Sequence, residues 1–323
     1  MTNLGLIVFS SKEESKLLKI KRFFLRKFID EPTKKIKINE ELNIYIIRIK
    51  YTLEEINKFK RFKIKRFKKN IYKYSVENRL DKCILPVSAP ESLEFGICIK
   101  NPFSGHFIYA ALLVNILEII AEKKGVSIKE FEIGILHGDN NNLLYSYIKL
   151  LSPLVKFITI ITNKKKNIQE EIDKIYYETG LSIRLTEDIE SGLDGLDIII
   201  NLGDFNNFKK GKKIKSNAIV INYGTLNSDE IIFSNIVVNG ISIKFDNSFE
   251  SALDKNTISC FTKLELASII FCHSEDRTNV NGNIADNSTV SSILSQFLKS
   301  GYKITSLVGS FQGTECKNLD LKI

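Results

Sequence analysis

Hydrophobic residues in the middle of the chain form short runs separated by amphipathic stretches. Continuous apolar runs predict buried strands, and apolar residues spaced three and four apart predict helices. The predicted strands lie at 133–136, 157–162, 182–185, 196–201, 218–222 and 236–238, and the predicted helices between them lie at 141–151 and 168–179. Strands alternating with helices indicate a parallel sheet with helices on both faces. We therefore expect a Rossmann-type domain from about Phe131 to Val238.

Different patterns flank this region. The N-terminal part predicts strands at 4–10, 42–49 and 83–88 and helices at 12–29 and 53–80. The 53–80 helix is basic, and its apolar stripe is Ile56, Phe59, Phe62, Phe67 and Ile71. An apolar helix at 107–124 ends at Gly125, where glycine favours a left-handed cap. Helices at 259–271 and 290–300 follow.

The expected fold class is α/β, with a central Rossmann-type parallel sheet. The N-terminal α+β domain should cover residues 1–100 and serve substrate binding or docking. The dinucleotide-binding-like domain should cover residues 101–258, and a helical C-terminal segment should cover residues 259–323.

The turn after the first strand of the predicted Rossmann domain lacks most of its glycines. A dinucleotide-binding turn uses glycines for the tight bend, for close approach to the pyrophosphate and for helix packing. Residues 137–143 read H-G-D-N-N-N-L, so Gly138 alone remains. Asn140 could form the turn because asparagine tolerates a positive φ, although its side chain would crowd a diphosphate. The negative charge of Asp139 would repel the negatively charged diphosphate unless the side chain is turned away. The turn is therefore either a modified nucleotide loop or a turn that binds nothing.

The end of the second predicted strand bears on cofactor choice. Rossmann enzymes place an acid here for the ribose of NAD, or a basic residue for the 2′-phosphate of NADP. The chain has Asn163 and Lys164 here, followed by two more lysines and no acid. If a dinucleotide binds, NADP is the expected cofactor; the alternatives are a solvated lysine cluster and no cofactor at all.

Composition narrows the class of protein. Hydrophobic residues make up 43% and charged residues 26% of the chain, as in ordinary globular proteins. Apolar runs are too short to predict a membrane span, and no secretory signal is expected at the N-terminus. The five cysteines form no C-x-x-C pair, which suits a reducing cytoplasm, and the three histidines have no metal-ligand spacing. We expect a cytoplasmic protein without a metal site.

A stretch of 39 residues carries a family resemblance. Gly105, Glu118, Gly125 and Ile128 fall in step, without a gap, with the long-chain acyl-[acyl-carrier-protein] reductases of the cyanobacterial type. Those enzymes have T-G-N before the helix, G-I-D-I after it and V-V-G-A-T-G-x-I-G as the nucleotide loop. The family's loop glycines fall on His137, Asn140 and Leu143, and all three are replaced.

The resemblance continues downstream and implies a reaction. Residues 218–224 and 237–240 are similar to the family's V-L-I-D-G-G and V-L-N-G-G segments, and Ser259-Cys260-Phe261 is similar to its A-C-F. That cysteine is the family's acyl-accepting nucleophile, so the resemblance implies that Cys260 attacks an acyl thioester and that NADPH reduces the acyl-enzyme to an aldehyde. A helix N-terminus would lower the pKa of the Cys260 thiol, and Lys263 would act in the same sense.

Two functions remain open at this stage. The first is a divergent NADPH-dependent acyl-thioester reductase with Cys260 as acyl acceptor. The second is a catalytically inactive Rossmann-fold relative that binds a partner or an acyl ligand. The missing glycines favour the second, and Cys260 favours the first. From the residues alone, a single cysteine at this position is more commonly a small buried side chain.

The net charge of +9 has one source. Between Lys58 and Lys73 there are nine basic residues and no acid, and without them the chain has 38 basic and 38 acidic residues. An acidic acyl carrier protein, or its acyl thioester, is a possible partner through electrostatic steering. The interleaved phenylalanines also suit an anionic membrane surface or RNA. Nucleic acid is the weakest of these because no recognised binding motif accompanies the charge. The segment could also be a solvated helix face.

Overall fold

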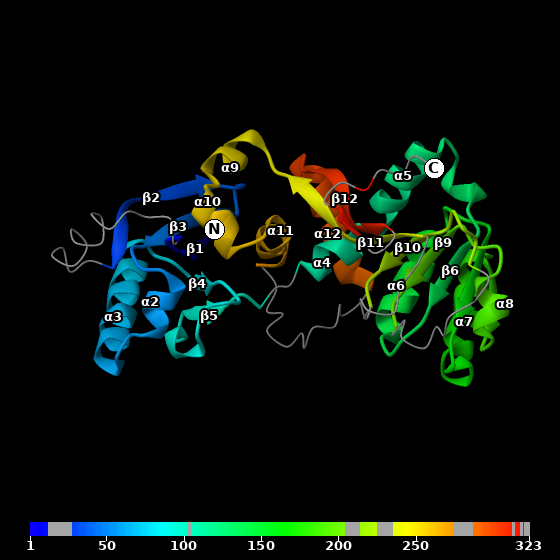
Figure 1. Cartoon of the computed structure of the whole chain (residues 1–323), viewed down its shortest axis with the longest axis horizontal. Helices are drawn as coiled ribbons and strands as arrows, with labels where there is room; N and C mark the ends of the chain where they lie inside the picture. Colours follow the sequence, from blue (N-terminus) through cyan, green and yellow to red (C-terminus); the bar gives the residue numbers. More distant parts are fainter. Residues whose placement is uncertain are drawn as a thin grey trace. The chain divides into compact units, whose positions relative to one another are not determined.

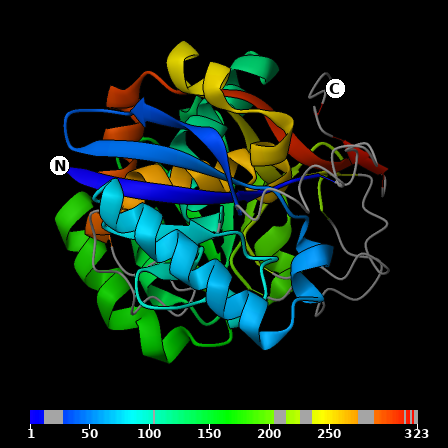
Figure 2. The ribbon, with the colours of Figure 1, turned by 90° about the vertical axis from the view of Figure 1, so that its left-hand side faces the viewer.

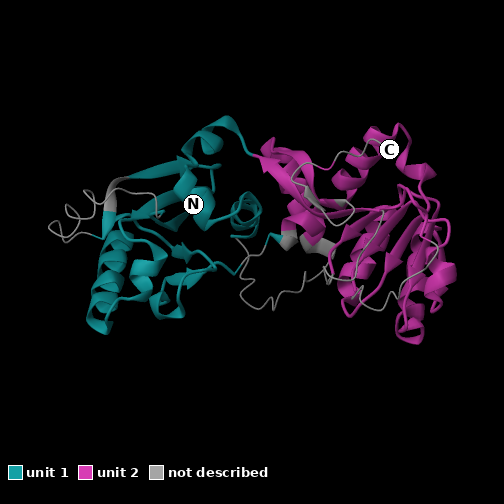
Figure 3. Cartoon of the chain, in the orientation of Figure 1, with its two compact units in different colours: residues 1–105, 245–279 teal, residues 106–244, 280–323 magenta. Residues whose placement is uncertain are grey.

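The computed structural model describes residues 1–11, 28–102, 105–203, 214–224, 235–273, 287–311, 314–316 and 319. The chain forms two compact units (Figure 3). Unit 1 contains Met1–Gly105 and Phe245–Asn279, and unit 2 contains His106–Lys244 and Val280–Ile323. The first crossover lies close to the expected boundary at residue 100. The expected boundary at 258 differs from this division, in which the chain leaves the second unit at residue 245 and returns to it at residue 280.

Unit 1 is built on a five-stranded sheet of order β2-β3-β1-β4-β5 (Figure 1). The strands are β1 (Thr2–Phe9), β2 (Ile29–Lys37), β3 (Leu42–Ile49), β4 (Lys82–Leu85) and β5 (Cys98–Lys100). Only β2 is antiparallel to its neighbour among these described strands. The middle strands β1 and β3 are apolar over nearly their whole length because both sheet faces are covered. Most of the helix expected at 12–29 lies outside the described residues.

The basic region of unit 1 forms two helices instead of one. Helix α2 (Leu53–Asn57) begins with a capping box between Thr52 and Glu55, and α3 (Arg61–Glu77) follows after a short break. Phe67 and Ile71 of α3 are fully buried against the sheet. Phe62 was expected in the apolar stripe, but its side chain points outward and is 70% exposed. It lies more than one turn from Phe67, on another side of the helix.

Three more helices complete the described part of unit 1. They are α9 (Asn247–Ala252), α10 (Lys255–Cys260) and α11 (Lys263–Cys272), and a short 3-10 turn, η1 (Glu91–Leu93), precedes β5. Helix α10 packs on β1, and Arg48 of β3 donates two hydrogen bonds to Asp254, the N-cap of α10, at 2.7 and 3.0 Å. These contacts explain why a late segment of the chain belongs to the N-terminal unit.

Unit 2 contains an eight-stranded sheet of order β13-β12-β11-β10-β9-β6-β7-β8. The strands are β6 (Ile133–Leu136), β7 (Phe157–Ile161), β8 (Ser182–Thr186), β9 (Ile198–Asn201), β10 (Ile219–Asn222), β11 (Ile236–Lys244), β12 (Lys303–Phe311) and β13 (Thr314–Cys316). The strands from β6 to β11 are parallel and follow the Rossmann order, with the sheet growing outward in both directions from β6 and β9. The expected α/β class with a Rossmann-type parallel sheet is confirmed.

The sequence predicted a helical C-terminal part, but the structure also has strands there. Helix α12 (Asn287–Ser300) is followed by β12, which pairs antiparallel with β11, and by β13. Residues 303–311 read K-I-T-S-L-V-G-S-F and lack the strict alternation of apolar and polar residues that would predict a strand. The parallel sheet is therefore extended by antiparallel strands at one edge.

Unit 2 also contains the helices α4 (His106–Ala111), α5 (Leu113–Lys124), α6 (Asn141–Leu151), α7 (Lys165–Thr179) and α8 (Ile189–Leu193), with a 3-10 turn, η2 (Ile128–Glu130), before β6. Helices α6 and α7 follow the predicted positions closely, whereas the helix expected at 107–124 is divided into α4 and α5, and α8 was not predicted. Gly125 caps α5 with φ of 67°, as expected. No helix in the described part of the chain has the length and apolar character needed to cross a membrane.

A cluster of three tyrosines, two of them fully buried and one half-buried, fixes α4 and α6 to the sheet. The ring of Tyr223, which follows β10, lies 4.5 Å from that of Tyr109 on α4 and 5.3 Å from that of Tyr147 on α6, measured between centroids. Tyr109 donates its hydroxyl hydrogen to the carbonyl of Val238 at 2.7 Å, and Tyr147 donates to that of Ala110 at 3.1 Å. Burial raises the pKa of all three phenols, so they stay neutral.

The loops after β6, β9 and β10 touch through glycine backbones. A Cβ added at Gly138 would lie 2.7 Å from Gly203 Cα, and one at Gly224 would lie 1.8 Å from Gly203 O. Asparagines link the same strand ends: Asn201 donates to Asn222 at 2.7 Å, and Asn222 donates to Asn239 at 3.0 Å. The carboxyl edge of the sheet is therefore closed by backbone contact and by a side-chain amide ladder.

Replacing Gly224 by alanine tests this close approach. Because the new Cβ would collide with the carbonyl of Gly203, we expect Gly224→Ala to lower the free energy of unfolding by about 1–3 kcal/mol in urea denaturation. Gly240→Ala is the matched control, since no atom lies within 4 Å of its added Cβ. Equal stability of the two variants would contradict the contact.

Candidate functional site

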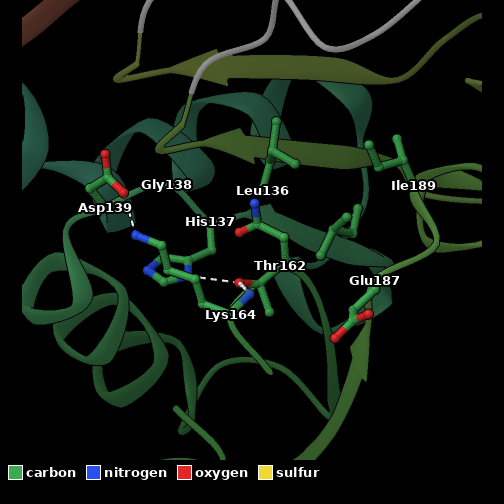
Figure 4. Close-up of a pocket in the computed structure, with 10 residues that line it drawn as sticks. Leu136, His137, Gly138, Asp139, Thr162, Lys164, Glu187 and Ile189 are labelled. Carbon is green, nitrogen blue, oxygen red and sulfur yellow. Dashed lines mark hydrogen bonds and ion pairs between the residues drawn. The ribbon is translucent and has the colours of Figure 1, made fainter. Parts of the chain in front are cut away.

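A cavity of about 260 Å³ opens at the carboxyl ends of three adjacent parallel strands of unit 2 (Figure 4). Its lining comes from the segments that follow β6, β7 and β8: Leu136, His137, Gly138, Asp139, Ile161, Thr162, Asn163, Lys164, Glu187 and Ile189. Ligands of open α/β sheets bind outside the carboxyl ends of the strands. Four of the five predicted cofactor residues, Gly138, Asp139, Asn163 and Lys164, line this cavity.

Asn140, the fifth predicted residue, has a different role. It is the N-cap of α6, and its Oδ1 accepts a hydrogen bond from the backbone N–H of Leu143 at 3.0 Å. Its φ is −91°, so the positive φ expected for this turn is wrong. Asparagine is a strong capping residue, and here it satisfies an amide that a bound phosphate would otherwise use.

Leu143 closes the same end of the helix. Its side chain is 7% exposed and packs at the start of α6. A glycine there would let the helix approach the strand, whereas the leucine fills that space with packed side chain. The start of α6 is therefore a capped and packed helix end.

Asp139 and Lys164 form an ion pair across the mouth of the cavity (Figure 4). The neighbouring ammonium holds the pKa of the Asp139 carboxyl below its ordinary value. The repulsion expected between Asp139 and a phosphate is thereby reduced, but the charge of Lys164 is already partly compensated. Because Asp139 is almost fully exposed, solvent screens the pair and it is readily opened.

His137 forms the floor of the cavity. Its ring is 7% exposed, and its Nδ1 lies 3.0 Å from the hydroxyl oxygen of Thr162, which also accepts the backbone N–H of Lys164 at 3.0 Å. Burial, and then the charge of Lys164, lower the pKa of the imidazole. His137 is therefore a neutral hydrogen-bonding group that holds the β7 loop in place.

His137, Thr162 and Glu187 also line the cavity and were not predicted as members of the site. His137 was treated only as a lost glycine, and Glu187 lies after the third strand, where no ribose-binding acid was sought. Their positions could have identified them, because each is a polar residue just beyond the carboxyl end of a parallel strand, where ligands of such sheets bind.

The residues present fit half of a dinucleotide better than the whole. Typical small-molecule sites have volumes of about 300–1,000 Å³. The cavity, at about 260 Å³, has room for one nucleoside half. Lys164 could bind a phosphate on that half. The capped start of α6 does not fit a pyrophosphate, because Asn140 already accepts the amide hydrogen of Leu143.

Cys260, the predicted nucleophile, belongs to unit 1, whereas the cavity belongs to unit 2. The expectation that it begins a helix is wrong, because it is the last residue of α10. The next helix, α11, starts at Lys263 and is capped by Thr262, whose side chain and that of Glu265 form a capping box. The helix-end effect expected to lower the thiol pKa is therefore not available to Cys260.

The surroundings of Cys260 also differ from the prediction. Its sulfur accepts the backbone N–H of Phe9 at 3.3 Å, and the side chain packs against the core of unit 1. Burial raises the pKa of the thiol, and the hydrogen bond from Phe9 offsets this only in part. Lys263 was expected to assist the thiolate, but it is paired with Glu250. Both predicted sources of activation are thus absent from the described surroundings.

Comparisons with known proteins give no family. No protein-family model matches the chain, and no curated protein matches it. Solved structures with partial similarity include L-tryptophan dehydrogenase from Nostoc punctiforme, at 10% identity over 92% of this chain and 81% of that one, with a TM-score of 0.30. Anabolic ornithine carbamoyltransferase from Campylobacter jejuni has 13% identity over 92% and 88%, with a TM-score of 0.30.

A third similar structure is Δ1-pyrroline-2-carboxylate reductase from Thermococcus litoralis. It has 14% identity and a TM-score of 0.28, and the match covers 41% of this chain and 40% of the reductase. Identities and TM-scores of this size say nothing about activity. The Rossmann-type assignment rests on the strand order of unit 2 itself.

The raised pKa of Cys260 has a measurable consequence. Since only the thiolate reacts with iodoacetamide, we expect Cys260 to be alkylated more slowly at neutral pH than a free cysteine, with a rate that keeps rising above the ordinary thiol pKa. Peptide mass spectrometry across a pH series measures the rate at this residue, and N-acetylcysteine gives the reference. Rapid alkylation that reaches its plateau below neutral pH would show an activated thiolate instead.

Proposed function

We propose that the chain is a nucleotide-binding Rossmann-type protein that does not carry out acyl-thioester reduction. The ligand is the adenosine 2′-phosphate half of an NADP-type nucleotide, bound in the cavity of unit 2. The observation that carries this proposal is the cavity itself, which lies at the carboxyl ends of β6, β7 and β8 and has Lys164 at its mouth.

The polar lining supports a nucleoside phosphate. Lys164 would exchange its exposed partner Asp139 for a phosphate, which carries more charge and more acceptor oxygens than a carboxylate. Glu187, on the β8 side of the cavity, offers carboxylate oxygens to the free 3′-hydroxyl of the ribose. Leu136, Ile161 and Ile189 supply an apolar wall of the kind that a base requires.

Two observations argue against hydride transfer to an acyl group. The start of α6 is capped by Asn140, so a pyrophosphate would have to displace that cap before it could use the Leu143 amide. Cys260 lies at a helix end with a raised pKa, which lowers the thiolate fraction needed for acyl transfer. Acyl transfer needs the thiolate, and hydride transfer needs a cofactor bound through its pyrophosphate. The arrangement of these residues favours neither step.

The divergent acyl-thioester reductase is the second candidate. One observation favours it: the sulfur of Cys260 accepts a backbone N–H from Phe9, which would stabilise a thiolate. Incubation with a long-chain acyl thioester and intact-mass measurement distinguishes the two candidates. An adduct present in the native chain and absent from Cys260→Ala would favour the reductase, and no adduct would favour the non-catalytic protein.

Titration calorimetry with adenosine 2′,5′-bisphosphate tests the proposed site. We expect Lys164→Ala to weaken binding about tenfold, because a charge-assisted hydrogen bond is lost. Asp139→Asn should strengthen binding, because it releases Lys164 from its ion pair. Lys166→Ala is the matched control, because it removes an exposed lysine from the first turn of α7, the helix that Lys164 caps. It should have no effect on binding.

The pyrophosphate gives a second comparison in the same experiment. If α6 remains capped, NADP should bind no more than about threefold more tightly than the bisphosphate, since the remainder of the dinucleotide finds little additional binding energy. Absence of saturable binding for both compounds at millimolar concentration would refute the proposal. The proposal would also be refuted if the Lys164→Ala variant bound the bisphosphate more tightly than the native chain does.

A further inference from the structure

The outward face of α3 combines large apolar side chains with cations. Phe62, Tyr72 and Val76 are 70%, 57% and 60% exposed. Between them, on the same face, lie four exposed basic residues: Lys65, Arg66, Lys69 and Lys73. These positions recur every three or four residues and therefore form one continuous stripe along the helix. Figure 2 shows α3 in front of the strands of unit 1, with this helix toward the viewer.

Most charges of the basic segment are not paired with the residues of unit 1 that the structure describes. Lys63 lies over the rings of Tyr51 and Phe59, at 4.5 and 3.8 Å from their centroids, and Lys68 donates to the carbonyl of Glu94 at 2.8 Å. Lys73 pairs with Glu77. Six basic side chains make no ion pair or side-chain hydrogen bond with any described residue: Lys58, Lys60, Arg61, Lys65, Arg66 and Lys69.

We propose that this face of α3 docks on the surface of an anionic lipid bilayer. The cations would lie at the lipid headgroups, and Phe62, Tyr72 and Val76 would enter the boundary between headgroups and acyl chains. Helices that lie in the interface have this composition, with basic residues and a few large apolar side chains. Lysine and arginine stems are long enough to keep their charges in the headgroups while the helix sinks.

Charge complementarity supports an anionic surface. The rest of the chain has equal numbers of basic and acidic residues, so the net charge of +9 is concentrated in this one segment. An anionic surface would therefore orient the whole molecule with α3 facing it. Each basic residue near such a surface contributes about 1 kcal/mol of attraction, which falls with added salt.

The apolar positions distinguish a bilayer from RNA. Phe62 and Val76 are 14 residues apart, which corresponds to about 21 Å along a helix. Tyrosine and phenylalanine rings can stack on bases, but valine has no ring to stack, so RNA would leave Val76 in water. A bilayer accepts aromatic and aliphatic side chains along the whole stripe without a separate pocket for each.

Vesicle flotation of the full chain tests the proposal. We expect binding to phosphatidylcholine vesicles that contain about a third phosphatidylserine, no binding to phosphatidylcholine alone, and loss of binding at high salt. Lys65→Glu/Arg66→Glu/Lys69→Glu should lower the partition constant by about 100-fold or more. Lys123→Glu/Lys129→Glu/Lys299→Glu has the same charge change at exposed lysines outside the segment, and it should keep most of the binding.

A second pair of variants tests insertion independently of charge. Phe62→Ala should weaken vesicle binding about fivefold or more, because apolar area that enters the interface is removed. Tyr177→Ala, at a tyrosine that is 84% exposed on α7, should leave it unchanged. The exposed positions make unfolding of these variants unexpected, and circular dichroism checks it.

Three results would overturn the proposal. They are absence of binding to the anionic vesicles by the native chain, equal loss in the control triple variant, and tighter binding to a short RNA or to an acidic carrier protein than to the vesicles. The last result would assign the face to a different class of macromolecule. Fluorescence anisotropy of labelled RNA and labelled carrier protein provides that comparison.

Discussion

The backbone contact among Gly138, Gly203 and Gly224 determines how unit 2 is arranged at the edge where Rossmann domains bind ligands. Each of these residues follows a parallel strand; Gly138 and Gly224 have no room for a Cβ, and a Cβ at Gly203 would lie only 3.2 Å from its nearest neighbours. Because the loops after β6 and β9 touch, the cavity lies over β6, β7 and β8 instead of between β6 and β9. The ladder from Asn201 to Asn239 then pairs the polar groups that this close packing would otherwise bury without partners.

The turn before α6 is a coherent local structure rather than a damaged phosphate loop. Asn140 caps the helix, Leu143 fills the space behind it, and His137 supports the neighbouring β7 loop through Thr162. Each of these three residues has a structural role, so the turn is stable as a capped and packed helix start.

Much of the fold follows from local sequence patterns. The boundaries of β6 and α6 were predicted to the residue, because a short apolar run and an amphipathic run leave little choice of structure. Gly138, Asp139, Asn163 and Lys164 were predicted because strand ends are recognisable in the sequence, and all four line one cavity. The ion pair of Asp139 with Lys164, and the contact of Cys260 with Phe9, join residues 25 and 251 positions apart, and local periodicity carries no information about such pairs.

The prediction for Cys260 failed for a related reason. Its sequence neighbourhood suggested the beginning of a helix, but Asp254 starts an earlier short helix by capping it, and Thr262 starts the next. Cys260 therefore lies at the end of the first of these helices, and its surroundings are decided by tertiary contacts such as that with Phe9. In the same way, β12 was missed because its pairing with β11 is decided by a strand some 60 residues away.

Helix α10 has a further consequence for how the chain is made. Unit 1 needs residues from both ends of a long sequence interval, since β1 packs on a helix that follows the whole parallel sheet of unit 2. The residues of unit 1 that precede unit 2 are translated before α9, α10 and α11, so the contact of β1 with α10 can form only after the parallel strands of unit 2 have been translated. Unit 1 therefore completes its packing late, and β1 lacks this helix in the meantime.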